Sequence, residues 1–500
     1  MKNAIKFIVI LLIFSMISFT LACNNAKNVN NTDNLSNNAE ANNIDGGENS
    51  ESAEAEEIPF PREIRDFEGY TFKVLIDKQW SGNHLDIEDL DIEEMNGEVL
   101  NDAYYTRKML MEEVYNVKLE GIRVEDIGGY ANKSVKAGLD EYDAYAPRLM
   151  NAATFATRGY GVNVLDTTLS LSAPWWDQNI INDTSIGGYA YFIAGDIFIK
   201  HYDGIALLMF NKKIIEDFGL ESPYNLVNNN QWVVDKFNEM AKGVTFDLNN
   251  DGKMDRYDRY GFVTQADYVT SFINACGEKI VSKDNDDMPV FTGYSEKMVS
   301  VMDKMLDIYV DDTYCMHRNA YGKENGGGQL VQFWVFPEGR ALFYWAFPRY
   351  MDLGLRNMED NFGIVPLPKW DSNQPRYYAT LNNWHSYTYM IPITVADVEK
   401  SAYIMDAMAY HGRQIIKPAY YDVCLQRKYT RDEESSAMLD IIFSSTVYDL
   451  GTVFGIGGIT GSIEGELQRN QINLTSIYEK SVGRIEKDIA KLIDQFEANR

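Results

Sequence analysis

The sequence predicts an α/β body in which helices cover a largely parallel sheet. Residues 70–76, YTFKVLI, are β-rich and bounded by Gly69 and Asp77, as a strand would be. Residues 98–115 carry apolar side chains at helical spacing, and residues 117–124 return to a strand pattern. This strand–helix–strand order is typical of parallel sheets, because a crossover helix carries the chain back between parallel strands.

Four later apolar runs also predict strands. Residues 189–199 and 205–211 are the densest apolar stretches in the middle of the chain, as expected of buried strands. Residues 362–368 and 387–393 have the same character further along. We expect all four to contribute to the sheets of the body.

Two helices are expected to close the chain. The first would start at an N-cap, Thr394, and run to about Tyr410, just before Gly412. The second would fill about residues 475–497, where apolar side chains fall on one stripe that would face the core.

The charge balance limits the partners of the chain. Its 500 residues include 46 Lys and Arg against 74 Asp and Glu, so the formal net charge is −28. Phosphate backbones and anionic lipid surfaces are bound by basic surfaces, so nucleic acid and polybasic membrane attachment are excluded. A hydrophobic content of 45% excludes a disordered chain, and the length is sufficient for two or more domains.

Residues 1–22 have the pattern of a secretory signal. Two lysines precede an uncharged apolar run that is too short to span a bilayer comfortably and that ends at Ala22. Cys23 follows, and the junction resembles the lipobox of bacterial lipoproteins, with Thr20 where leucine is usual. We therefore expect Cys23 to be acylated; the alternative is a plain signal peptide with a chance cysteine.

Residues 23–57 predict a disordered, lipid-anchored linker. The stretch is rich in asparagine and acidic residues and has almost nothing apolar to bury. No later run is apolar and long enough to span a membrane. The folded body is therefore expected at the outer face of the cell membrane, held there by the lipid anchor.

The remaining cysteines are Cys276, Cys315 and Cys424. Because three is an odd number, at most one disulfide can form among them. They show no zinc-ligand spacing, and the expectation is that they are small buried side chains.

Residues 247–258 contain the sharpest local motif. Oxygen-bearing side chains fall at positions 1, 3, 5, 9 and 12 of a loop, and Gly252 stands at position 6, where a calcium loop turns sharply. A helix over 232–243 and a strand over 259–263 would flank it, so we expect a structural Ca²⁺; the alternative is an acidic surface turn. The expected ligands are Asp247, Asn249, Asp251, Lys253 (by its carbonyl), Asp255 and Asp258.

Motifs for catalysis are missing from the sequence. The five histidines form no metal pair at helical spacing, and neither a nucleophile elbow nor a Walker A sequence occurs. The sequence therefore gives no positive evidence for an enzyme.

The order of several segments over about residues 65–500 resembles the family 1 extracellular solute-binding proteins, the lipoprotein receptors of ABC sugar importers. Each segment is short, and Phe210 stands where the family usually has tyrosine. The segments that carry the resemblance are TFKVLID (71–77), 96–104, 113–117, Tyr142–Tyr145, ALLMFNK (206–212), EGRALF (338–343), FGIVPLP (362–368), 395–410 and the last helix.

The resemblance implies a two-lobed, periplasmic-binding-protein-like (type II) α/β fold in which hinge strands join the lobes and ligand closes them. By segment order the calcium loop would lie in the C-terminal lobe. The N-terminal lobe would comprise about 58–199 and 378–430, and the C-terminal lobe about 203–375 and 435–500.

Ligand contacts are expected at strand ends that face the crevice, where aromatic rings can cover sugar faces and polar groups can pair with hydroxyls. Trp345 and Trp384 are the leading pair, and Trp175, Trp176 and Asp177 are expected at the rim. The candidates are Trp80, Arg148, Asp196, Asp203, Trp345, Phe347, Arg349, Asn383, Trp384 and His385.

The function implied by the resemblance is that of a monomeric, non-catalytic receptor. It would capture a carbohydrate, an oligosaccharide by expectation, and deliver it to the permease subunits of an ABC transporter. The alternative is a surface-anchored, calcium-dependent carbohydrate-active enzyme or an adhesion module. Peptide ligands also stay open, because fold does not fix function.

Overall fold

The computed structural model describes residues 58–78, 90, 92–265, 268–317, 332–355, 358–426, 433–469 and 471–499. Residues 60–500 form one compact unit. The predicted signal segment, Cys23, the predicted linker and Trp80 lie outside the described residues, as does the side chain of Cys424. Within the described part, no helix combines the length and apolar character needed to cross a lipid bilayer.

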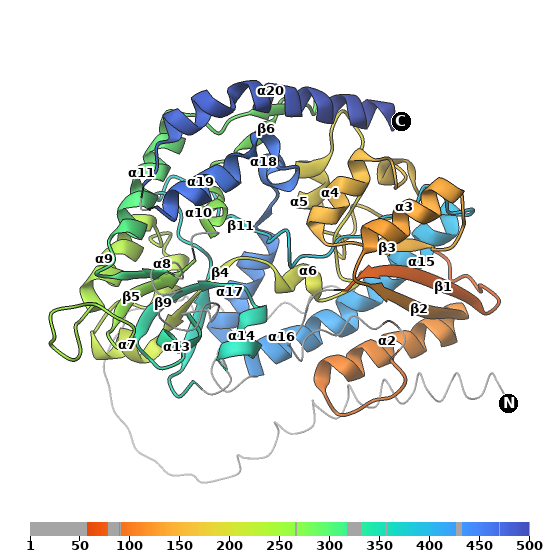
Figure 1. Ribbon diagram of the computed structural model, residues 1–500. Coiled ribbons are helices and arrows are strands. Elements are labelled where there is room, and N and C mark those ends of the chain that lie inside the picture. The colour runs from red at the N-terminus through yellow and green to blue at the C-terminus, as the bar shows by residue number, and fades with distance from the viewer. Residues whose placement is uncertain are drawn as a thin grey trace, which may run out of the picture. The chain divides into compact units, whose positions relative to one another are not determined.

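Two main sheets organise this unit (Figure 1). The first has the order β2-β1-β3 and is parallel throughout. The second has the order β10-β4-β9-β5-β8. The strands are β1 (Tyr70–Asp77), β2 (Val117–Val124), β3 (Ala144–Ala146), β4 (Leu207–Asn211), β5 (Tyr260–Thr264), β6 (Val281–Lys283), β7 (Pro289–Phe291), β8 (Cys315–His317), β9 (Ala341–Ala346), β10 (Phe362–Val365), β11 (Ala379–Thr380) and β12 (Thr446–Val447).

The second sheet is mixed. β4 runs antiparallel to both β9 and β10, while β5 runs parallel to β8 and β9. The expectation of a largely parallel sheet is therefore confirmed for the first sheet and wrong for β4 and β10. The strand predictions at 70–76, 117–124, 205–211 and 362–368 match β1, β2, β4 and β10.

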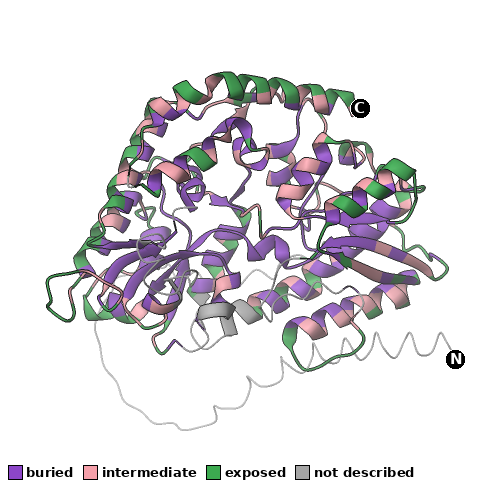
Figure 2. Cartoon of the chain, in the orientation of Figure 1, coloured by how far each residue is buried: buried purple, intermediate pink, exposed green. Residues whose placement is uncertain are grey.

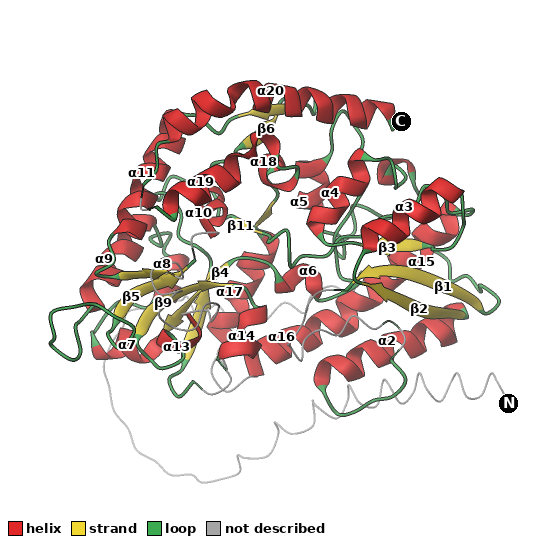
Figure 3. Ribbon diagram, in the orientation of Figure 1, coloured by secondary structure: helices red, strands yellow, loops and turns green. Residues whose placement is uncertain are grey.

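Helices flank both sheets (Figure 3). Strands β4, β5, β9 and β10 of the second sheet are buried throughout, whereas β2 of the first sheet is partly exposed (Figure 2). The predicted helices at 98–115, 232–243 and 475–497 are confirmed as α2, α9 and α20. The helices are α2 (Val99–Tyr115), α3 (Ile127–Ala137), α4 (Leu149–Thr157), α5 (Gln178–Thr184), α6 (Lys200–Asp203), α7 (Lys212–Asp217), α8 (Pro223–Asn228), α9 (Val234–Val244), α10 (Val269–Ala275), α11 (Glu296–Val310), α13 (Gln332–Val335), α14 (Arg349–Gly354), α15 (Val398–His411), α16 (Lys417–Gln426), α17 (Glu433–Ser444), α18 (Leu450–Val453), α19 (Ile459–Leu467) and α20 (Leu474–Ala498).

The strands predicted at 189–199 and 387–393 are wrong. Both segments are largely buried, but they meet the rest of the fold through isolated bridges, such as Ile193 with Tyr389 and Tyr145 with Met390. Their apolar runs reflect burial on all sides, a property that does not by itself require a hydrogen-bonded ladder.

The helix predicted from Thr394 begins later and does not stop at Gly412. Its N-cap is Asp397, whose carboxylate accepts the amide of Lys400. The chain continues through a π-helical turn, η3 (Gly412–Ile416), into α16. Glycine is required at 412 by close approach, because a Cβ there would overlap the carbonyl oxygen of Asp196.

Two chain segments cross between the sheets beside each other. The amide of Ala206 donates to the carbonyl of Thr380 (2.9 Å), and that of Asn382 donates to the carbonyl of Gly204 (2.8 Å). We call residues 204–206 and 380–382 the crossing ribbon. Helix α6 and strand β11, between the sheets in Figure 1, belong to these two crossings.

The last helix, α20, contacts both halves of the unit. Near its start, the ring of Tyr478 stacks on that of Phe291 with 5.4 Å between centroids. Near its end, Phe496 meets Tyr191 edge-on at 5.1 Å, and the Asn499 side chain donates to the Ala156 carbonyl (2.8 Å). Its end thus lies against segments assigned from the sequence to the N-terminal lobe.

Candidate ligand-binding site

Side chains from both sheets and from the loop after the crossing ribbon meet at one place. Asp77 ends β1, Arg148 follows β3, and Phe347 and Arg349 follow β9. Ligands of open α/β sheets bind at such carboxyl ends of strands. We call the set Asp77, Arg148, Asn151, Tyr268, Phe347, Arg349, Trp384 and His385 the strand-end cluster.

The Asp77 carboxylate anchors the first-sheet side of the cluster. It is fully buried, and it accepts hydrogen bonds from Nε of Arg148 (3.0 Å), from a terminal nitrogen of the same guanidinium (3.3 Å) and from Nδ2 of Asn151 (2.5 Å). The Arg148 side chain is 18% exposed. A two-point contact of this kind fixes the plane of the guanidinium.

Trp384 provides an open aromatic face. Trp384 is 59% exposed, which is the largest value among the exposed aromatic residues of the described chain. The centre of the Arg148 guanidinium lies 5.8 Å from its ring centroid. The Trp384 amide donates to the side-chain oxygen of Asn382 (2.8 Å), which holds the turn that carries the indole. An indole held beside a fixed guanidinium can cover the apolar face of a ligand.

His385 joins the two sides of the cluster as a neutral side chain. Its Nδ1 lies 2.8 Å from a terminal nitrogen of Arg349. Burial and the positive charge of Arg349 lower the pKa of His385 to about 3. Because Arg349 is always a donor, Nδ1 of the neutral ring accepts and Nε2 carries the proton.

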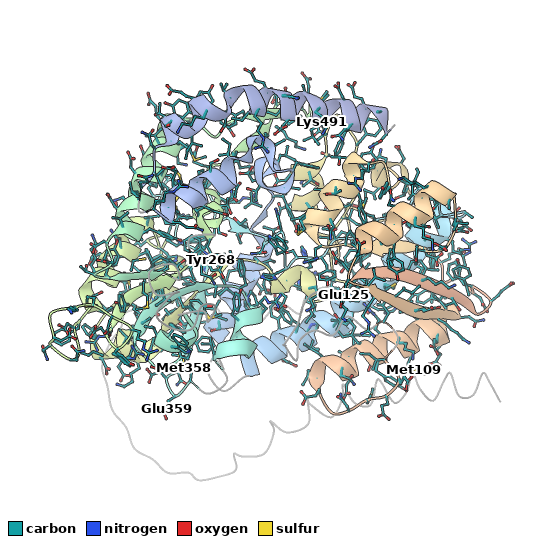
Figure 4. The ribbon with its side chains drawn as sticks, viewed as in Figure 1. Met109, Glu125, Tyr268, Met358, Glu359 and Lys491 are labelled. Atoms are coloured by element: carbon teal, nitrogen blue, oxygen red, sulfur yellow. The ribbon has the colours of Figure 1, made fainter. Side chains whose placement is uncertain are left out.

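Aromatic rings form the second-sheet side. Phe347 lies 5.1 Å from Tyr268 in an edge-on contact and 6.1 Å from the ring of His385. Figure 4 labels Tyr268, whose hydroxyl accepts a hydrogen bond from Nε2 of Gln265 (2.7 Å). Aromatic rings and polar groups thus lie next to one another in the cluster.

The structure brings together five of the candidates proposed from the sequence, namely Arg148, Phe347, Arg349, Trp384 and His385. Asn383 lies in the same turn, but its side chain donates to the carbonyl of Thr452 (3.0 Å). Asp196 and Asp203 are buried near the crossing ribbon, outside the cluster.

Trp345 lies in the core. It is 2% exposed and sits between the rings of Phe262 (6.1 Å) and Phe272 (5.8 Å). This packing leaves no open face for a ligand, so Trp384 alone of the leading pair is presented to solvent. Trp175 and Trp176, expected at a rim, are also buried, and both indole nitrogens donate to Asp406.

Sequence reasoning missed Asp77, Asn151 and Tyr268. Asp77 was visible as the polar residue that ends the first strand, which is the position where ligand-facing groups collect. Asn151 and Tyr268 carried no such signal, because neither ends a strand. Asn151 lies in the first turn of α4, and Tyr268 lies just before α10.

Residues 247–258, which are predicted to bind calcium, form a tight acidic loop before β5 of the second sheet. Both oxygens of the Asp247 carboxylate accept backbone amides, from Asn250 (2.7 Å) and Gly252 (2.8 Å). Asp258 is fully buried and accepts the amides of Leu248 and Asp255. Gly252 has the positive φ of 81° expected at position 6. Among the described residues no three His, Cys, Asp or Glu form a metal-ligand group, so calcium stays a prediction.

Cys276 and Cys315 are free, buried thiols, and no disulfide joins them. Burial raises the pKa of both thiols well above the usual value. They therefore behave as the small apolar side chains that the sequence predicts.

Comparisons with known proteins address the fold. No protein-family model matches the chain, and no curated protein matches it. Solved structures do match. An ABC substrate-binding protein from Listeria monocytogenes in complex with cycloalternan has a TM-score of 0.53 at 12% identity, over 84% of this chain and 99% of that one.

Two more solved structures agree with the first. An ABC transporter solute-binding protein from Thermotoga lettingae bound to α-D-tagatose has a TM-score of 0.52 at 14% identity, over 84% of this chain and 100% of that one. UspC of M. tuberculosis has a TM-score of 0.54 at 11% identity, over 84% of this chain and 100% of that one. The chain therefore has the two-lobed α/β fold of the periplasmic binding proteins, which confirms the predicted fold class.

Proposed function

We propose that this chain is an extracytoplasmic receptor, anchored by lipid at Cys23, that captures a carbohydrate and delivers it to an ABC transporter permease. It acts as a monomer and catalyses no reaction. The observation that carries the proposal is the exposed indole of Trp384 beside the Arg148–Asp77 pair, at strand ends of the first sheet.

The chemistry of the cluster suits a sugar. A pyranose ring presents an apolar face, which an exposed indole can cover, and a rim of hydroxyls that both donate and accept. Arg148 can donate to such hydroxyls, and Asp77 balances the charge of its guanidinium and fixes its plane.

The similar solved structures support the same class of ligand. The Listeria protein was solved with cycloalternan and the Thermotoga protein with tagatose. We extend that class, not those ligands, to this chain, and we propose an oligosaccharide as the ligand. The sequence motifs give no support to the enzyme alternative.

The proposal predicts that Trp384→Ala weakens glycan binding. A glycan found on an array should raise the melting temperature of the full chain by ligand linkage. Removing the indole should cost about 2 kcal/mol, or roughly thirtyfold in Kd. Tyr257→Ala is the matched control, because Tyr257 is 56% exposed but lies on the calcium loop. Equal weakening by both changes would contradict the site.

The anchor is tested by fractionating cells that make the full chain. We expect the native protein in the membrane fraction and the Cys23→Ser variant released from it, since acylation at this thiol is the proposed attachment. A Cys23→Ser variant that stays with the membrane would contradict a lipid anchor at this residue.

We propose further that residues 247–258 bind a structural Ca²⁺. An oxygen-rich loop of this spacing can wrap six or more ligands around the ion, and extracytoplasmic calcium can fill even a weak site. A chelator should lower the melting temperature of the full chain, and Asp247→Asn should abolish this response while Asp217→Asn preserves it. An unchanged melting temperature and metal content after chelation would refute the site.

A further inference from the structure

Residues 382–386 form a tight turn at the end of the crossing ribbon, and we call them the Trp384 turn. The amide of Ser386 donates to the carbonyl of Asn382 (2.9 Å), and the amide of Trp384 donates to the side chain of the same asparagine. On its hinge side the turn has no spare room, because a Cβ at Gly204 would overlap the hydroxyl oxygen of Ser386. These contacts fix the backbone from which the indole of Trp384 projects.

The Trp384 turn takes the place of an N-cap for helix α4, which follows β3 of the first sheet. Arg148 stands at the N-cap position but makes no side-chain hydrogen bond to the helix. The amide of Leu149 instead donates to the carbonyl of Ser386 (2.9 Å), and that of Met150 donates to the carbonyl of Asn383 (3.3 Å). Because the first amides of a helix have no partner inside it, these two contacts attach the turn to α4.

The side chain of Asn383 attaches the turn to a second helix. Its Nδ2 donates to the carbonyl of Thr452 in α18 (3.0 Å). Helix α18 is itself held in place, since the buried carboxylate of its N-cap, Asp449, accepts the amides of Ile280 (2.6 Å) and Val281 (3.1 Å). The Asn383 amide therefore connects the turn to a helix that is anchored on β6.

The two attachments belong to different lobes. By the assignment from the sequence, α4 lies in the N-terminal lobe and α18 in the C-terminal lobe. A movement of the lobes about the crossing ribbon must therefore either break the hydrogen bond of Asn383 or shift the turn that carries Trp384. Asn383 thus links the place of the indole to the arrangement of the two lobes.

We propose that Asn383 is a positioning residue, whose amide holds the Trp384 turn against α18 and so places the indole for the ligand. The sequence predicts a direct ligand contact for Asn383, whereas its amide is used by Thr452. The role rests on the proposed receptor function, because it serves binding at Trp384. An attachment of this kind increases affinity, since an ordered turn loses less freedom when the ligand binds.

Glycan titration of Asn383→Asp in the full chain tests this role. The substitution keeps the shape of the side chain but replaces the amide donor with an oxygen that cannot bond to the Thr452 carbonyl. We expect the Kd of the array-selected glycan to rise about tenfold. Asn383→Gln keeps the amide donor and should bind the glycan more tightly than Asn383→Asp. Asn225→Asp is the matched control, because Asn225 is exposed on α8.

A second measurement needs no ligand. Trp384 is 59% exposed, so acrylamide quenching of its fluorescence reports how freely the quencher reaches the indole. The difference between each chain and its Trp384→Phe counterpart isolates the contribution of Trp384. We expect this contribution to increase in Asn383→Asp, because the turn has lost one attachment, and to stay unchanged in Asn225→Asp. A side chain that only supports the fold would lower the urea midpoint of Asn383→Asp without altering the quenching or the Kd.

Unchanged quenching in Asn383→Asp would overturn the proposal, and so would an unchanged Kd for a glycan that Trp384→Ala binds more weakly. Equal effects of Asn383→Asp and Asn225→Asp would also overturn it, as would an Asn383→Gln chain that binds no more tightly than Asn383→Asp. Failure of the receptor role would appear differently, as glycan binding that Trp384→Ala leaves unchanged. In that case the quenching of the ligand-free chain still decides whether Asn383 positions the indole.

Discussion

Replacing Asp77 with alanine should lower the free energy of unfolding by about 3–5 kcal/mol, the usual cost of breaking a buried ion pair from one side. Asp77 has no exposed surface, and three nitrogens of the Arg148 and Asn151 side chains donate to it. Without the carboxylate, the Arg148 guanidinium has lost its counter-charge and its fixed plane. Glycan affinity should fall along with stability.

Asp217→Ala is the control for this effect. Asp217 pairs with Lys213 at 2.8 Å one helical turn away, but both side chains are about half exposed, and such pairs contribute little. Denaturant titration of the full chain measures both variants. A loss below about 1 kcal/mol for Asp77→Ala would show that Arg148 does not depend on this carboxylate.

Stability should also fall as the pH drops from about 6.5 to 4, and His411 should account for part of the loss. Burial, followed by the charge of Arg107, lowers the pKa of His411 to about 4, against 6.5 for an ordinary histidine. The unfolded chain therefore takes up a proton in this window that the folded chain refuses. The contribution is present above pH 6.5 and amounts to at most about 3 kcal/mol.

Melting temperatures across this pH range compare the native chain with His411→Gln. The amide can still bond the hydroxyl of Tyr115, which lies 3.1 Å from Nε2 of His411, but it does not titrate. The variant should lose less stability on acidification than the native chain. Parallel pH profiles for the two proteins would mean that His411 is not the group responsible.

Local sequence patterns predicted those helices and strands that bury only one face. The strand over 70–76, the helix over 98–115 and the last helix all follow from one-sided apolar periodicity, which reports burial of one face. The run at 189–199 misled for a physical reason. It is buried all round, and a continuous apolar stretch does not distinguish a laddered strand from a buried extended segment.

The candidate site could be predicted only in part. Trp384 and His385 could be predicted because they stand just before the apolar run at 387–393. Trp345 looked equivalent in sequence, yet its side chain points from β9 toward the rings of Phe262 and Phe272. The pairing of Arg148 with Asp77, 71 residues apart, depends on the register of β1 with β3. No local pattern contains that information.

The most direct test of the receptor assignment is titration of the full chain with a glycan selected on an array, followed by mass analysis of the recovered glycan. The assignment predicts saturable binding of one glycan at the strand-end cluster, roughly thirtyfold weaker in Trp384→Ala, with the glycan recovered intact. Recovery of cleaved glycan, or an affinity that Trp384→Ala leaves unchanged, would contradict it.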